Sequence, residues 1–259
     1  VTNMEKVLVP NIKKRVAAET DHKVRIIEAY AGKIAKVHET LEAVEKGLLD
    51  IGSYCVCFET AKLLPWNFDY FVPFTTTNLE TNWAVKHKIL KQFPYLTKML
   101  EDKYNQKFIA MQGFDDYGLG TVKQWQKASE LKGVKVIAAG PNLPWVSLFG
   151  SIPVTSTLPT MYNDLATGVA KGVIIFPSAH AGGFKFYEQA PYWKVIGFGA
   201  MAQTITTINL DTLKKLPPEV AKIIMEEAQN YEKAAVKDGQ QRYQKGLTDL
   251  VKLGKKKGI

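Results

Sequence analysis

The side chains that could recognise a ligand stand at turns that follow strand-like segments. Val134–Ala139 is a short apolar run, and the glycine and prolines at 140–144 break it, as at the end of a buried strand. Trp145 follows and could stack on a flat ligand, although core packing is an equally good interpretation because a buried indole N–H needs a partner. Asn142 could present its amide, or the backbone N–H groups of the next helix, to an anion; simple N-capping is the alternative.

Hydroxyl groups at two other turns could donate hydrogen bonds to an acid. Ser53 and Tyr54 stand at the start of an apolar strand-like run, where surface turn residues are also common. Tyr117 lies in the glycine-flanked segment 113–118 beside Asp116. An aspartate next to an anionic ligand is unfavourable unless it is paired, so Tyr117 is the better candidate of the two.

A further wall of a binding site is predicted after the apolar run Val173–Phe176. Phe176, Ser178 and His180 could line it, because the segment leaves a strand and enters a glycine-containing loop. A single histidine in such a loop is more often structural than a ligand contact. These residues therefore suggest a binding surface of aromatic rings and neutral donors.

Nothing in the sequence demands catalysis, a cofactor or a metal. No nucleophile, base and orienting group occur at a telling spacing, and there is no phosphate-binding loop. Cys55 and Cys57 are the only cysteines; we expect two small buried residues, because a disulfide between positions two apart on a strand would be strained. No histidine or cysteine pair lies nearby at the spacing of zinc ligands.

The formal net charge of +9 suggests nucleic acid as a partner, but its make-up argues against one. Only three arginines are present, and lysines such as Lys86 and Lys222 stand among acidic residues, as on solvated helix faces. The lysines near the C-terminus lack interleaved aromatic residues, which favours a solvated end over a binding arm.

The elements that would position these side chains alternate between helix and strand. The N-terminal part predicts a helix at 3–19, a strand at 23–30, a helix at 37–46 and a strand at 48–58, the rhythm of a mainly parallel sheet. An aromatic loop at 64–78 and a helical stretch at 79–105 follow. Proline marks the start of a long helix over 217–253, with Val220, Ile224, Tyr231 and Ala235 as its buried stripe.

Further strands are predicted at 108–112, 152–155, 173–176 and 203–209, with a helix at 158–170 and a loop at 178–184. At 259 residues the chain can form one domain or two lobes. No apolar run reaches the length of a membrane-spanning helix, and the N-terminus lacks the pattern of a signal peptide.

Four stretches in this order resemble the solute-binding proteins of tripartite ATP-independent periplasmic (TRAP) transporters, the DctP-like family. They are LEAVEKGLLDIG at 41–52, ELKGVKV at 130–136, YNDLATGVAKG at 162–172, and KFYE at 185–188 together with LKKLPPEV at 213–220. The resemblance implies an α/β fold of two lobes with crossover strands and a long C-terminal helix bracing both lobes. It places lobe I at 1–116 plus about 200–216, lobe II at 117–199 and the helical region at 217–253.

The resemblance also implies a function. We expect a periplasmic receptor that closes on a small organic acid between its lobes and delivers it to integral membrane TRAP subunits, without catalysis. The family's signal peptide and first strand are expected to be absent from this chain. A two-lobed α/β enzyme for small acids and a ligand-sensing domain remain as alternatives.

The chain departs from the family pattern where a carboxylate is usually bound. Many members carry an arginine that forks onto the ligand carboxylate, and here that position is Ile137. Lys171 likewise replaces the aspartate of the helix-end motif. GPNLPW at 140–145 resembles a branch whose pocket takes aromatic monocarboxylates. We therefore expect an aromatic or otherwise apolar monocarboxylate held by neutral donors.

Overall fold

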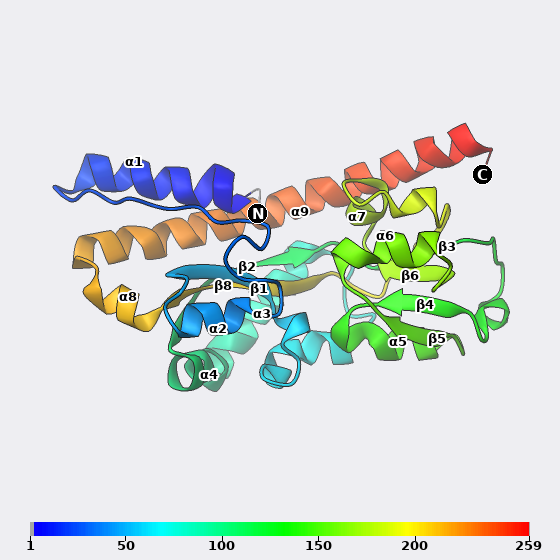
Figure 1. Cartoon of the computed structure of the whole chain (residues 1–259), viewed down its shortest axis with the longest axis horizontal. Coiled ribbons are helices and arrows are strands. Elements are labelled where there is room, and N and C mark those ends of the chain that lie inside the picture. The colour runs from blue at the N-terminus through cyan, green and yellow to red at the C-terminus, as the bar shows by residue number, and fades with distance from the viewer. Residues whose placement is uncertain (1–2, 259) are drawn as a thin grey trace. The chain divides into compact units, whose positions relative to one another are not determined.

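The computed structural model describes residues 3–258 and divides into two compact units. Unit 1 comprises the segment that ends at Trp66, together with Trp83–Gly113 and Ala202–Asp238. Unit 2 comprises Asn67–Asn82, Phe114–Met201 and the segment from Gly239 onward. Figure 1 follows these segments by colour along the chain. Residues 67–82 thus fall in unit 2, whereas the sequence places them in lobe I; the lobe boundaries stay a prediction.

Unit 1 contains a sheet with strand order β1–β8–β2. Its strands are β1 (Ile51–Cys55), β2 (Gln106–Phe114) and β8 (Met201–Asn209). β1 pairs with β8 antiparallel, and Ser53 lies opposite Thr206. The prediction of a mainly parallel sheet is therefore wrong for β1, because its partner comes from far along the chain and runs the other way.

Helices pack around this sheet in unit 1. They include a π-helical turn (Met4–Leu8) that leads into α1 (Val9–Glu19), α2 (Thr40–Glu45), α4 (Tyr95–Tyr104), α8 (Leu210–Lys215) and most of α3 (Leu79–Gln92). Asn209 begins α8 by accepting hydrogen bonds from the N–H groups of Asp211 and Thr212. Asn105 ends α4 in the left-handed region at φ 50°.

The long C-terminal helix is α9 (Pro218–Lys257), drawn from orange to red in Figure 1. In unit 1 it buries Val220, Ile224, Tyr231 and Ala235, as the sequence predicts. This stripe packs against Leu8 of the π-helical turn and against Ile12 and Val16 of α1. The helix continues through Gly239 and Gly246, so neither glycine ends it.

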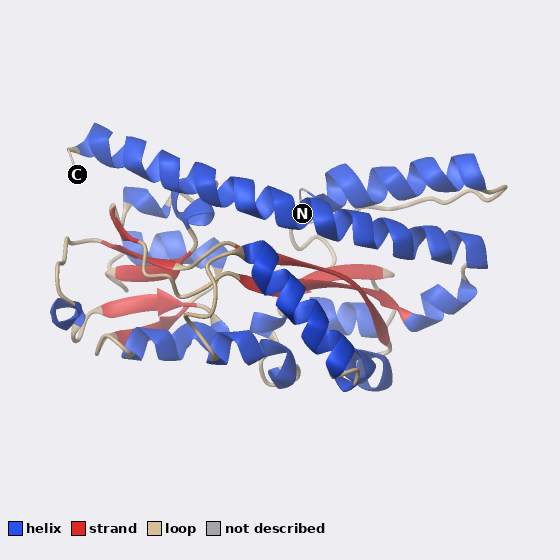
Figure 2. Cartoon of the chain, turned by 180° about the vertical axis from the view of Figure 1, so that it is seen from behind, coloured by secondary structure: helices blue, strands red, loops and turns tan. Residues whose placement is uncertain are grey.

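Unit 2 contains a mixed sheet with strand order β5–β4–β6–β3–β7. Its strands are β3 (Gly118–Thr121), β4 (Lys135–Ala138), β5 (Ile152–Thr155), β6 (Gly172–Ile175) and β7 (Tyr192–Lys194). β4 runs parallel to β5 and β6, whereas β3 runs antiparallel to β6 and β7. The helices of unit 2 include α5 (Leu143–Ser147), α6 (Leu158–Ala166) and α7 (Pro177–Ala181), and Figure 2 distinguishes helices, strands and loops throughout the chain.

Two predicted segments differ from the structure. The described residues 23–30 form no strand; Val24 and Ile26 pack on the core beside α1, and Ile27 is 76% exposed. The β-branched residues that suggested a strand therefore lie in a segment without regular secondary structure, which packs on the core through Val24 and Ile26. Residues 178–184 are not all loop either, because α7 occupies Pro177–Ala181 with proline at its first position.

Cys55 and Cys57 form a disulfide, so the prediction of two unbridged cysteines is wrong. That prediction assumed an extended strand through both residues. Instead β1 ends at Cys55, and a 3₁₀ turn (Val56–Phe58) follows. The two Cα atoms are 5.1 Å apart, within the usual range for a disulfide.

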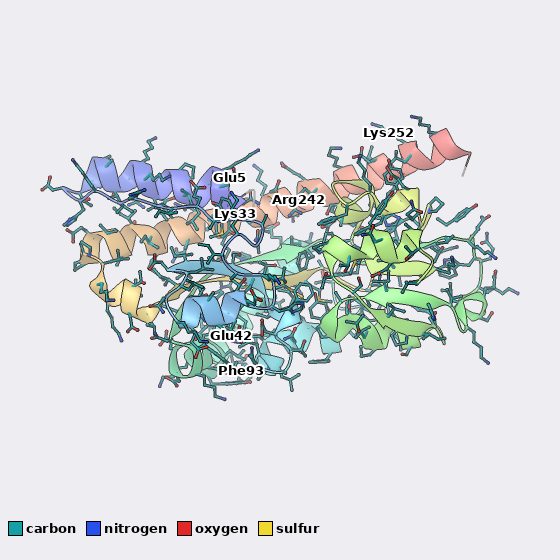
Figure 3. All side chains as sticks on the ribbon, in the orientation of Figure 1. Glu5, Lys33, Glu42, Phe93, Arg242 and Lys252 are labelled. Atoms are coloured by element: carbon teal, nitrogen blue, oxygen red, sulfur yellow. A yellow bond between two sulfur atoms is a disulfide. The ribbon has the colours of Figure 1, made fainter. Side chains whose placement is uncertain are left out.

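Lys86 is also not on a solvated face, because it is 1% exposed within α3. Its Nζ donates a hydrogen bond to the backbone carbonyl of Trp66 at 3.3 Å. By contrast Lys252 lies exposed near the end of α9 (Figure 3).

Candidate functional site

Unit 2 brings together aromatic side chains from segments that are far apart in the sequence. They come from the 3₁₀ segment Leu64–Phe71, the crossover after β2, α5, the end of β6 and the segment before β8. We call the following residues the aromatic cluster: Tyr70, Phe114, Tyr117, Trp145, Phe176 and Phe198.

The rings of the cluster pack in stacked and edge-on pairs. Trp145 stacks on Phe198 with centroids 4.9 Å apart, and Phe176 stacks on Phe114 at the same distance. The ring of Tyr117 lies edge-on to Trp145 at 5.6 Å and to Phe176 at 5.5 Å. These are the geometries that aromatic quadrupoles favour, so the cluster is an ordered and largely buried group of rings.

Trp145 is 2% exposed and uses its polar end within the cluster. Its indole Nε1–H donates to the backbone carbonyl of Tyr70 at 2.9 Å. This hydrogen bond gives the buried indole N–H the partner that it requires. Trp145 therefore holds the segment of Tyr70 against α5.

Tyr70 and Tyr117 place two hydroxyl groups together inside the cluster. Their Oη atoms are 3.1 Å apart, and the side chains are 2% and 5% exposed. Burial raises the pKa of both phenols, so both remain neutral at physiological pH. The two hydroxyls are neutral polar groups within a largely apolar cluster.

Asn142 does not offer its side-chain oxygen to α5. Its Oδ1 accepts a hydrogen bond from the backbone N–H of Ala139 at 2.9 Å, and the residue is 1% exposed. The helix that begins behind it, α5, spans only five residues. The macrodipole of so short a helix is weak. Because Asn142 accepts its hydrogen bond from Ala139, its role is to shape the turn after β4.

Ser178 and His180 are also occupied by the fold. Asp115 accepts hydrogen bonds from the Ser178 hydroxyl at 2.9 Å and from its backbone N–H at 3.3 Å. His180 is completely buried, with Nε2 2.9 Å from the carbonyl oxygen of Ala190. Burial lowers the pKa of His180 to about 4, so the ring is neutral near pH 7.

Ser53 and Tyr54 lie in unit 1, on β1. The Tyr54 hydroxyl donates to Oε1 of Gln106 at 3.0 Å, and Tyr54 is 4% exposed. The Ser53 hydroxyl accepts from Thr206 at 3.2 Å across the β1–β8 pair. Within unit 1 both hydroxyls belong to the hydrogen bonding of the sheet.

Two buried acids stand at the crossover from β2 to β3. Burial raises the pKa of Asp115, and it raises the pKa of Asp116 to about 6. Asp116 accepts a hydrogen bond from the backbone N–H of Gly199 at 2.9 Å. Asp115 therefore fixes the start of α7, and Asp116 fixes the segment before β8.

The sequence predicted only part of this arrangement. Tyr117, Trp145 and Phe176 were candidates, and they meet in one cluster. Tyr70, Phe114 and Phe198 were missed, although Tyr70 lies in the aromatic-rich stretch 64–78 that was interpreted as a loop packing on the core. Phe198 could have been noticed by the glycines on either side of it, Gly197 and Gly199, which both have positive φ.

Across residues 3–258, no group of three or more histidine, cysteine, aspartate or glutamate side chains gathers in a way that could hold a metal ion. None of the helices described is both long and apolar enough to cross a membrane.

Comparison with known proteins identifies a family. The model of the family described as bacterial extracellular solute-binding protein, family 7 (DctP) matches residues 2–256. Comparison with curated protein sequences found no match.

Solved structures give the same fold. An extracytoplasmic solute receptor of Bordetella pertussis that binds pyroglutamic acid superposes with a TM-score of 0.83 at 18% identity, over 98% of this chain and 80% of that one. A TRAP solute-binding protein from a marine metagenome, in complex with pyroglutamate, has a TM-score of 0.77 at 20% identity, over 95% and 79%. A TRAP periplasmic solute-binding protein of Chromohalobacter salexigens with bound D-glucuronate has a TM-score of 0.81 at 16% identity, over 97% and 82%.

At these identities the likeness establishes the fold. It confirms the predicted α/β solute-binding-protein fold with its long C-terminal helix.

Proposed function

The chain belongs to bacterial extracellular solute-binding protein family 7, and from this premise we propose that its ligand is an aromatic or otherwise apolar organic monoacid. As a member of this family it is an extracytoplasmic solute receptor and not an enzyme, which removes the enzyme alternative. It binds a small organic acid and works with the membrane subunits of a TRAP transporter. The aromatic or apolar character of the acid is the new element.

The aromatic cluster of unit 2 is the observation that carries this proposal. It contains six rings from five separate segments, with Trp145 and Tyr117 at its centre. Flat aromatic faces suit a ring-bearing ligand, because stacking and edge-on contacts add to the burial of apolar area. A strongly hydrated ligand such as a dicarboxylate would gain little from such a surface.

Ile137 supports the same conclusion. It stands on β4 at the position where many relatives carry a carboxylate-binding arginine, and it is fully buried beside Val154 and Val173. An isoleucine cannot donate a hydrogen bond or supply charge. The ligand's carboxylate would therefore be held by neutral donors, which makes a dicarboxylate clamped by arginine a poor candidate.

The predicted site residues receive different roles in this proposal. Trp145, Tyr117 and Phe176 face the ligand with their rings. Asn142, Ser178 and His180 hold the turns and the short helix that carry those rings, through the hydrogen bonds described above. The hydroxyls of Ser53 and Tyr54 are held within unit 1. They could contact a ligand only if Ser53 lost its hydrogen bond from Thr206 and Tyr54 lost its hydrogen bond to Gln106.

Tryptophan fluorescence titration tests the ligand class. We expect saturable binding of benzoate and much weaker binding of succinate, with pyroglutamate and D-glucuronate included because structural neighbours bind them. Trp145→Phe should abolish most of the ligand-linked signal. Trp125→Phe is the matched control, because Trp125 lies in the same unit but contacts Lys194 and Phe149 rather than Trp145.

Mass spectrometry of small molecules released from the denatured protein gives an independent test. Tight binding of succinate without binding of benzoate would overturn the aromatic or apolar assignment. Preferential binding of pyroglutamate or glucuronate would replace it by the ligand class of those neighbours.

A further inference from the structure

The hydroxyl pair of Tyr70 and Tyr117 has more hydrogen-bonding capacity than the fold uses. Each phenol carries one donor proton, and the contact of 3.1 Å between the two Oη atoms uses one of them. Among the residues that the structure describes, neither hydroxyl makes a second hydrogen bond. One O–H donor of the pair is therefore left over inside a buried cluster.

Either hydroxyl can be the donor in this contact. The proton of the other hydroxyl then remains for another acceptor. The hydrogen bond that this second hydroxyl accepts makes it a better donor.

The surroundings strengthen such a donor. The rings of Trp145 and Phe176 stand edge-on to Tyr117, and the two hydroxyls are buried among apolar groups. A hydrogen bond formed in an apolar environment is electrostatically stronger than one in water. A carboxylate that reached this point would be an acceptor of the strong, charge-assisted kind.

We propose that the hydroxyl pair of Tyr70 and Tyr117 donates the hydrogen bond that holds the ligand's carboxylate oxygen. The inference rests on the proposed function, since it takes the ligand to be a monoacid. In this inference, two neutral phenols of unit 2 make the polar contact that an arginine makes in many members of the family.

Two carboxylates oppose an anion at this point. Asp69 and Asp115 both raise the pKa of Tyr117 through their charge, so both act on the pair electrostatically. Arg242, labelled in Figure 3, partly offsets Asp115, because its charge lowers the pKa of that acid. Removing the charge of Asp115 should therefore strengthen the binding of an anion.

Paired titrations with benzoate and its neutral isostere nitrobenzene test the proposal. Tyr117→Phe should weaken benzoate binding about 10- to 100-fold, while nitrobenzene changes by less than about threefold. Tyr70→Phe should also weaken benzoate binding, because either variant leaves a single hydroxyl without the hydrogen bond that strengthens it as a donor. Tyr162→Phe is the matched control, since Tyr162 lies on α6 and its hydroxyl donates to Glu188 at 2.7 Å rather than to a residue of the cluster.

Asp115→Asn provides a test with the opposite sign. Asparagine keeps an oxygen for Ser178 but removes the negative charge, so benzoate should bind about two- to fivefold more tightly and nitrobenzene equally well. A role of these residues in packing alone would not produce this gain. If Tyr117→Phe fails to fold, as judged by circular dichroism, Asp115→Asn and Tyr70→Phe decide the question.

The outcomes separate the two proposals. Absence of monoacid binding by the wild type overturns the proposed function and this inference with it. Binding of benzoate by the wild type and equally by Tyr117→Phe overturns this inference alone.

Discussion

Gly246 of α9 provides a sharp test of packing in unit 2. A Cβ at this position would lie 2.7 Å from the carbonyl carbon of Pro177 and 2.7 Å from the nitrogen of Ser178. Both atoms belong to the backbone at the start of α7, so no side-chain rotation can relieve the contact. Gly246→Ala must displace α9 or α7.

The magnitude follows from two opposing effects. Overpacking against backbone costs about 1–3 kcal/mol, and the upper half of that range applies because neither partner can yield alone. Alanine in place of glycine within a helix returns about 1 kcal/mol. Gly246→Ala should therefore lower the free energy of unfolding by about 1–2 kcal/mol.

Gly239→Ala is the matched control on the same helix. Its Cβ would meet Cδ2 of Leu79 at 2.5 Å, which is the end of a flexible side chain that can move away. The gain in helix propensity then offsets the cost of the contact. The stability of Gly239→Ala should stay within about 1 kcal/mol of the wild type.

Thermal unfolding followed by circular dichroism measures the difference. In a chain of this size 1 kcal/mol corresponds to about 2–4 °C, so Gly246→Ala should melt about 2–8 °C below the wild type. A melting temperature for Gly246→Ala equal to that of Gly239→Ala would show that the close approach of α9 to α7 does not limit stability.

Three further predictions concern buried polar and apolar positions. Trp145→Phe removes the hydrogen bond to the buried carbonyl of Tyr70 and should cost about 1–3 kcal/mol in urea unfolding, whereas an unchanged midpoint would contradict the role of the indole N–H. Burial raises the pKa of Asp116 to about 6, so the folded state binds this proton more tightly than the unfolded state. The free energy of unfolding should therefore fall as the pH rises from about 4 to 6. Asp116→Asn should remove that slope and add about 1–2 kcal/mol at pH 7, allowing for solvent screening; a slope that persists in the variant would refute the assignment. Ile137→Arg should place an uncompensated charge in the core of β4 and lower stability by about 3–5 kcal/mol, while a stable variant that binds succinate would show that the position still opens to the ligand.

The sequence predicts most helices and strands where periodicity is strong. The buried stripe of α9 is an example, because apolar residues at helical spacing alternate there with many charged ones. β6 is fully buried and reads as a continuous apolar run. In both cases the local pattern and the tertiary packing impose the same requirement.

Long-range partners explain what could not be predicted. β3 is rich in glycine and gives no apolar signal, because Gly118 and Gly120 lie against the rings of Trp193 and His180. The residues next to Lys86 in the sequence are typical of a surface lysine. Its burial, with a hydrogen bond to the carbonyl of Trp66, depends on a segment that is distant in the sequence. Individual residue types do not reveal which distant segment covers them.

The same limit applied to the aromatic cluster, where core packing and ligand recognition were competing interpretations of each ring. In the structure Trp145 packs as a core residue, because its N–H donates to the carbonyl of Tyr70 and its ring stacks on Phe198. Ile137 fills the position from which an arginine would reach a carboxylate. Under the proposed function, recognition of the acid depends on neutral donors. Within the aromatic cluster the hydroxyl donors are those of Tyr70 and Tyr117, so under that proposal residues that order the core would also select the ligand.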